Sequence, residues 1–209
     1  MREMLVTEGL NELKTLDARI DRAIRNAEFV ADAKDSDKKV TPAKTKEDFA
    51  ADAKAAYDSI NALIARREAI KSAIVASNAV AEVEICGEKM TVAKAIDTKN
   101  SIEYKQKLKD TMKRQLQNAK ASMNKKNADL ETKITKMVEA SCSKDGKVAP
   151  EDYEAIATPM RKNNEVSLVD PLELEKKIEE LEAYIEEFTA TVDAKLQISN
   201  CITKIQIDE

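Results

Sequence analysis

The segment from Ser141 to Asp152 is the part of the sequence closest to a metal-binding loop. Aligned on Gly146, it follows half of a calcium-binding EF-hand, with Ser141 and Ser143 at the first two ligand positions. Asp152 stands where that loop requires a bidentate glutamate, so too few carboxylates remain to hold a divalent ion. We therefore interpret the segment as an ordinary turn and expect neither a metal nor a cofactor.

The other residue types that could carry catalysis are either missing or placed on a helical face. The chain has no histidine, and Cys86, Cys142 and Cys201 are too far apart in sequence to form a CxxC pair. We interpret the three cysteines as reduced, partly buried thiols. Carboxylates such as Glu179 and Glu182 are close together in sequence. Acid–base catalysis, however, needs two carboxylates in different environments within a pocket. We expect that the protein is not an enzyme.

Charge is distributed unevenly along the chain, although the net charge is only -4. Lysine and arginine dominate the segment after residue 92, and glutamate dominates the segment after residue 170. Complementary charges of this kind select helix pairing, within one chain or between subunits. Nucleic-acid binding would need aromatic residues among the cations, and only Tyr104 is nearby, so we expect no nucleic-acid partner. The candidate interaction surface consists of Lys105, Lys109, Lys113, Arg114, Lys120, Glu179, Glu182 and Glu186.

The composition and the apolar spacing predict a mainly α-helical chain. About a third of the residues are charged and only 3% are aromatic, which is typical of long helices with a narrow aliphatic core. Apolar residues recur at a spacing near 3.6, so we predict one elongated helical domain over residues 1–209. Its predicted helices cover residues 7–31, 47–77, 92–140 and 171–199, and its predicted connections are a polar loop over 32–46 and a connector over 141–169 with a short helix at 151–157.

A short sequence repeat indicates how the helices end. Ser77-Asn78 and Ser199-Asn200 each follow a long helical pattern, and each is followed by β-branched alternation. Residues 82–91 form a predicted β-hairpin around Gly87. Because an isolated hairpin is marginally stable, we expect the strand at 201–207 to join it. The predicted architecture is an antiparallel long-helix bundle, or coiled-coil stem, capped by a small three-stranded sheet from residues 80–91 and 201–207.

The sequence also bears on membranes. The first residues are too few and too charged for a signal peptide, and no apolar run approaches the roughly 20 residues that span a bilayer. We expect no membrane partner.

Six segments carry a resemblance to known proteins: Ile64–Ile74, Ser77-Asn78, Gly87–Ile96, Asp170-Pro171, Ser199-Asn200 and the terminal strand. Together they resemble a family of helical proteins encoded by bacteriophages and prophages of Gram-positive gut bacteria. The middle of the chain is also similar to small helical proteins called septicolysin-like.

The phage resemblance implies a structural component of the virion, made in the host cytoplasm and associated with the capsid, neck or tail. Its partners would be other virion proteins, further copies of itself, or both. A cytosolic coiled-coil adaptor or regulator is the alternative. The septicolysin-like resemblance would imply a cytolysin, but the chain lacks the long apolar hairpin that would enter a membrane.

Overall fold

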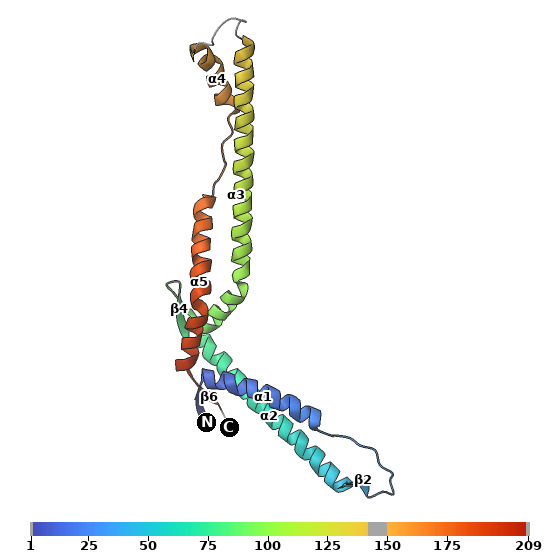
Figure 1. The fold of residues 1–209 in the computed structure, drawn as a ribbon. Coiled ribbons are helices and arrows are strands. Elements are labelled where there is room, and N and C mark those ends of the chain that lie inside the picture. The colour runs from blue at the N-terminus through green and yellow to red at the C-terminus, as the bar shows by residue number, and fades with distance from the viewer. Residues whose placement is uncertain (1, 142–149, 208–209) are drawn as a thin grey trace. The chain divides into compact units, whose positions relative to one another are not determined.

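The computed structural model describes residues 2–141 and 150–207, and these are mainly helical, as predicted (Figure 1). The helices of this part of the chain are α1 (Val6–Asn26), α2 (Lys46–Val80), α3 (Val92–Ser141), α4 (Pro150–Asn164) and α5 (Leu174–Ile202). Its strands are β1 (Arg2–Leu5), β2 (Lys39–Thr41), β3 (Lys44–Thr45), β4 (Glu82–Ile85), β5 (Glu88–Thr91) and β6 (Lys204–Ile207).

Contacts divide the chain into two units. The first unit contains Met1–Asn100 and Phe188–Glu209, and the second contains Ser101–Glu187. The strands and the α1–α2 pair belong to the first unit, whereas α4 and most of α3 belong to the second.

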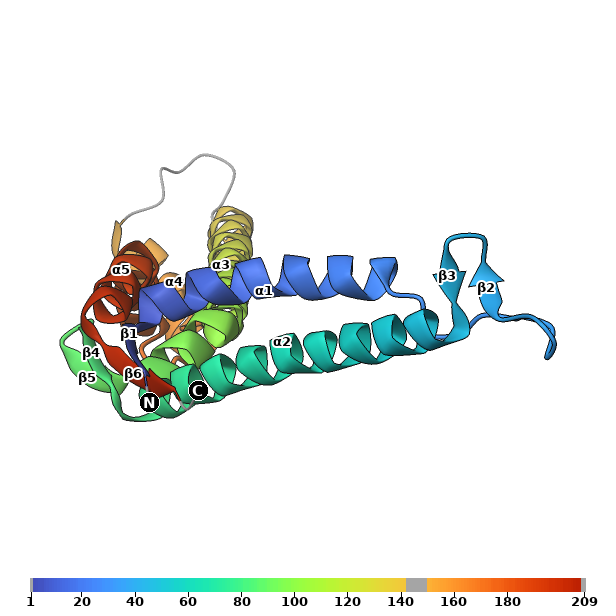
Figure 2. The same cartoon turned by 90° about the horizontal axis from the view of Figure 1, so that it is seen from below.

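Helices α1 and α2 lie side by side in the first unit (Figure 2). Arg66 donates to Glu12 at 2.9 Å, and Arg67 to Asp17 at 2.5 Å, along the flank of this pair. Gly9 lies at a close approach of the chain in the core. A Cβ atom on Gly9 would lie 3.2 Å from Ile205 and 3.3 Å from Ile74. The buried core of this unit contains Met4, Val6, Leu13, Leu16, Ile20, Ile70, Ile74, Ile205 and Ile207.

The C-terminal strand pairs with the N-terminal strand, and the predicted three-stranded sheet is therefore wrong. Strand β6 runs antiparallel to β1, with Met4 opposite Ile205 and Arg2 opposite Ile207. The Val6 N–H donates to the Thr203 carbonyl oxygen at 2.9 Å and extends the ladder into α1. The prediction failed because residues 2–5 are too few to show a strand periodicity in sequence, so no partner for β6 other than the hairpin was visible.

The predicted hairpin is present as a separate two-stranded sheet. Strands β4 and β5 are antiparallel, with Ile85 opposite Glu88 across a two-residue turn. Cys86 and Gly87 both have positive φ, 51° and 72°, which is the backbone of a type I′ turn. This turn matches the right-handed twist of the strands that it joins.

The segment predicted as a polar loop over 32–46 contains a second small hairpin. Strands β2 and β3 pair with a register irregularity, and α2 already begins at Lys46. Thr45 caps that helix, because its hydroxyl accepts from the Asp48 N–H at 3.1 Å while the Asp48 carboxylate accepts from the Thr45 N–H at 3.4 Å. The remainder of the segment is irregular and largely exposed.

The predicted connector over 141–169 contains helix α4, which is longer than the short helix expected at 151–157. Pro159 lies inside α4, and its usual role as a helix breaker made the sequence prediction too short. Ala157 of α4 packs with Leu130, Ile134 and Val138 of α3.

Polar contacts within the second unit join the rest of this connector to α3. Arg161 binds Glu131 through two hydrogen bonds of 2.8 Å. Asn127 holds Val166 by donating to its carbonyl oxygen and accepting from its N–H, each at 2.9 Å. Asp170 then accepts from the Leu174 N–H at 2.8 Å, and α5 begins at Leu174 rather than at the predicted residue 171.

We predict that deleting residues 204–209 removes amide-exchange protection from β1 and leaves the β4–β5 hairpin protected. The deletion takes the buried Ile205 and Ile207 out of the core, which costs about 3 kcal/mol or more of unfolding free energy. Hydrogen exchange measured residue by residue checks this. Loss of protection at Val83 and Ile85 with β1 unchanged would contradict the strand pairing.

We also predict that acid weakens the α1–α2 pair through Glu12. The hydrogen bond from Arg66 lowers the pKa of Glu12, and the nearby positive charges of Arg66, Arg2 and Arg19 act in the same direction against burial. A lowered pKa in the folded state gives stability that is present above the unfolded pKa and is lost as the pH falls through the folded pKa. Thermal melts of the wild type and of Glu12→Gln should therefore converge as the pH falls from about 6 towards about 2. A constant difference between the two would refute this linkage.

Candidate functional site

The predicted interaction surface lies where α3 and α5 run alongside each other in opposite directions. Successive contacts join higher-numbered residues of α3 to lower-numbered residues of α5. Lys105 lies over the Tyr184 ring at 3.7 Å, and Lys109 Nζ lies 3.6 Å from Glu182. Further along, Lys120 forms an ion pair with Glu175. The charge matching expected from the sequence therefore occurs within the chain at these positions.

Three of the predicted cations are thus engaged inside the molecule. Lys109 is the most enclosed, since its side chain is only 19% exposed and lies near Asp110 as well as Glu182. Tyr184 and Glu175 were not among the predicted residues. The charge contrast between the helices indicated which helices pair, but an aromatic partner for a lysine leaves no such signal in sequence.

The four remaining predicted residues are not engaged in this way. Lys113, Arg114, Glu179 and Glu186 are exposed, and none of them forms an ion pair within the part of the chain that the structure describes. Lys113 and Glu179 line a shallow hollow of about 260 Å³ between the two helices, together with the buried Leu116 and Ile178. These four charged side chains are available to a partner.

Exposed apolar side chains add to this surface on α3. Tyr104 and Leu108 are one helical turn apart and 67% and 53% exposed. Lys107 lies 5.6 Å from the Tyr104 ring, so a cation borders the apolar pair. Leu108 follows the apolar period of the helix, and for this reason the sequence alone assigns it to the core. Only the position of α5 shows that it remains uncovered.

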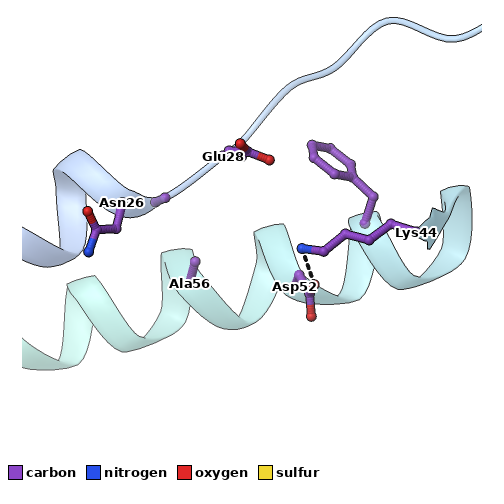
Figure 3. Close-up of a pocket in the computed structure, with 7 residues that line it drawn as sticks. Asn26, Glu28, Lys44, Asp52 and Ala56 are labelled. Atoms are coloured by element: carbon purple, nitrogen blue, oxygen red, sulfur yellow. Dashed lines mark ion pairs between the residues drawn. The ribbon is translucent and has the colours of Figure 1, made fainter. Parts of the chain in front are cut away.

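A separate hollow of about 420 Å³ lies in the first unit, where the C-terminal end of α1 faces the first turns of α2 (Figure 3). Lys44 Nζ lies 2.6 Å from Asp52 Oδ2 at its edge, and Asn26, Glu28 and Ala56 also line it. The hydrogen bond with Asp52 raises the pKa of Lys44, and the charge of Asp52 acts in the same direction. Because both side chains are well exposed, the pair is a solvated surface ion pair rather than a catalytic lysine.

Within residues 2–141 and 150–207, no group of three or more cysteine, aspartate or glutamate side chains is arranged to hold a metal ion. The EF-hand-like loop lies mostly outside the described residues. No helix in the same ranges is both long and apolar enough to cross a bilayer.

The surface on α3 and α5 therefore combines engaged charges, unpaired charges and an exposed apolar pair. Compared with protein-family models, curated proteins and solved structures, the chain matches none of them.

Proposed function

We propose that this chain is a non-enzymatic structural protein of a bacteriophage particle, associated with the capsid, neck or tail, that acts through protein–protein contacts. The observation that carries the binding role is the exposed pair Tyr104 and Leu108 on a helix that also holds the unpaired Lys113 and Arg114. The assignment to a phage particle is supported by the sequence resemblance. Copies of the chain itself and other virion proteins are the proposed partners.

The physical argument for binding begins with surface and core. The described cores consist mainly of aliphatic side chains, with Phe188 also buried, and much of each helix faces solvent. A chain of this kind gains stability when copies pair or when it docks on a larger scaffold. The helical turn of α3 that bears Tyr104 and Leu108 supplies apolar contact area, and the neighbouring cations orient the partner.

Charge indicates which surface would face this part of α3. Glu179 and Glu186 of α5 are exposed and unpaired within the described residues, and their negative charges are complementary to Lys113 and Arg114. We propose that α3 of one copy contacts α5 of another and that the antiparallel helix pairs form a coiled-coil stem. Exposed charge pairs are screened over roughly 8 Å at physiological ionic strength, so this contact weakens in salt.

A cytosolic coiled-coil adaptor made during infection remains the alternative. The same surface would serve it, so particle content distinguishes the two functions. Particles purified from a culture whose phage or prophage carries this gene should contain many copies of the chain per virion by quantitative mass spectrometry. Its absence from purified particles, with abundant protein in the infected cell, would favour the adaptor.

We predict that the double variant Lys113→Glu/Arg114→Glu weakens self-association about tenfold or more at low salt, because each substitution places a negative charge against Glu179 or Glu186. Sedimentation velocity over a concentration series measures this. Adding Glu179→Lys/Glu186→Lys should restore most of the association.

The matched control is Lys109→Glu, which disturbs a contact inside the chain. It should lower the melting temperature more than the double variant does. A wild-type protein that is monomeric at every concentration tested and also absent from particles would refute both the assembly and the virion role.

A further inference from the structure

The repeat seen in sequence corresponds to one local structure that occurs twice. Helices α2 and α5 both continue through the Ser-Asn pair and end three residues after its serine, at Val80 and Ile202. The Ala81 N–H then donates to the Ser77 carbonyl oxygen at 2.8 Å. The Thr203 N–H donates in the same way to Ser199 at 2.9 Å. Strands β4 and β6 follow, with the same alternation of exposed and buried residues.

The partner strands extend this equivalence to segments that showed no repeat in sequence. Strand β1 leads directly into α1, and β5 leads directly into α3. The Val92 N–H donates to the Ala81 carbonyl oxygen at 2.8 Å, as Val6 does to Thr203. Both partner strands have the same burial pattern, and Met4 and Met90 are each 5% exposed.

Residues 2–85 and 88–207 thus have the same order of elements. Each range begins with a strand and a helix, continues through an insertion, and ends with a helix and a strand. The insertion holds β2 and β3 in the first range and α4 in the second. The first strand of each range pairs with the last strand of the other, in the same antiparallel register.

We infer that the chain contains two copies of one strand–helix–helix–strand repeat, joined by the turn at Cys86-Gly87, and that charges on the strands act together with this turn to favour the exchanged pairing. Equivalent positions carry opposite charges: Glu3 corresponds to Lys89, and Lys204 to Glu82. Arg2 and Glu88 are reversed in the same way.

The observed pairs place opposite charges together. Lys204 Nζ lies 3.1 Å from Glu3 Oε2 across β6 and β1, and Lys89 is directly opposite Glu84 across β5 and β4. Opposite charges across an antiparallel pair are stabilising, and like charges are destabilising.

In the alternative arrangement, the first and last strands of the same repeat pair with each other, and like charges lie together. In the equivalent register, β1 against β4 would set Glu3 opposite Glu84 and beside Glu82. Strand β5 against β6 would set Lys89 beside Lys204. The apolar residues fit either pairing, because Met4 and Met90 are equivalent, as are Val83 and Ile205. The charges therefore disfavour the closed arrangement in both strand–helix–helix–strand repeats at once.

Disulfide trapping tests the pairing in the full-length chain with Cys86, Cys142 and Cys201 changed to serine. Glu3→Cys with Gln206→Cys should cross-link within one chain under mild oxidation, because these residues are directly opposite. Glu3→Cys with Glu84→Cys reports the closed arrangement and should remain reduced. Efficient cross-linking of residues 3 and 84 would overturn the exchanged pairing.

Charge reversal tests the selection. Glu3→Lys should speed amide exchange in β1 and β6 about two- to fivefold, the range expected for one cross-strand charge pair. Adding Lys204→Glu should restore the wild-type exchange rates, and the exposed control Lys14→Glu should change nothing.

The double variant Glu3→Lys/Lys204→Glu has lost its discrimination, because a positive charge at position 3 matches Glu84 as well as it matches a negative charge at position 204. We expect this variant to refold with a lower yield of native protein than the wild type. If Glu3→Lys leaves exchange unchanged, or if the double variant refolds as well as the wild type, the charges do not select the pairing.

Discussion

The pairing of β6 with β1 is the interaction on which the first unit depends. It joins the two ends of the sequence and brings Ile205 and Ile207 onto Ile70 and Ile74 of α2. Gly9 permits this approach, because a side chain there would meet Ile205, Ile74 and Ile70. The helix pair and the strand pair therefore share one apolar core, and neither buries its apolar face without the other.

The same local structure appears at the β4–β5 hairpin, where the connection is covalent. There a two-residue turn with positive φ at both positions holds the strands together. At β1 and β6 no turn exists, so the ladder, the Lys204–Glu3 ion pair and the buried isoleucines supply the closure. The two strand pairs therefore differ in the entropy cost of bringing their strands together. This cost is small for β4 and β5, which a two-residue turn connects, and larger for β1 and β6, which are far apart in sequence.

Helices α3 and α5 show how one charge pattern can serve two purposes. Lys109 and Lys120 meet α5 within the chain, and Lys113 and Arg114 on the same helix remain exposed. The intramolecular pairs help to set which residues of the two antiparallel helices lie opposite each other. The exposed residues, together with Tyr104 and Leu108, are left to define what the helix presents to other molecules.

The helical character, the β4–β5 hairpin and the pairing of a basic with an acidic helix could all be predicted from the sequence. Each depends on local spacing: a period near 3.6, a period of 2 around Gly87, or blocks of one charge. The partner of β6 could not be predicted this way, because Arg2–Leu5 is too short to show a period and lies at the opposite end of the sequence. The exposure of Leu108, the contact of Lys105 with Tyr184 and the strands at 39–45 also depend on which element lies nearby. Local spacing determined which elements form, and long-range packing decided which surfaces they cover, because burial depends on neighbours that are distant in the chain.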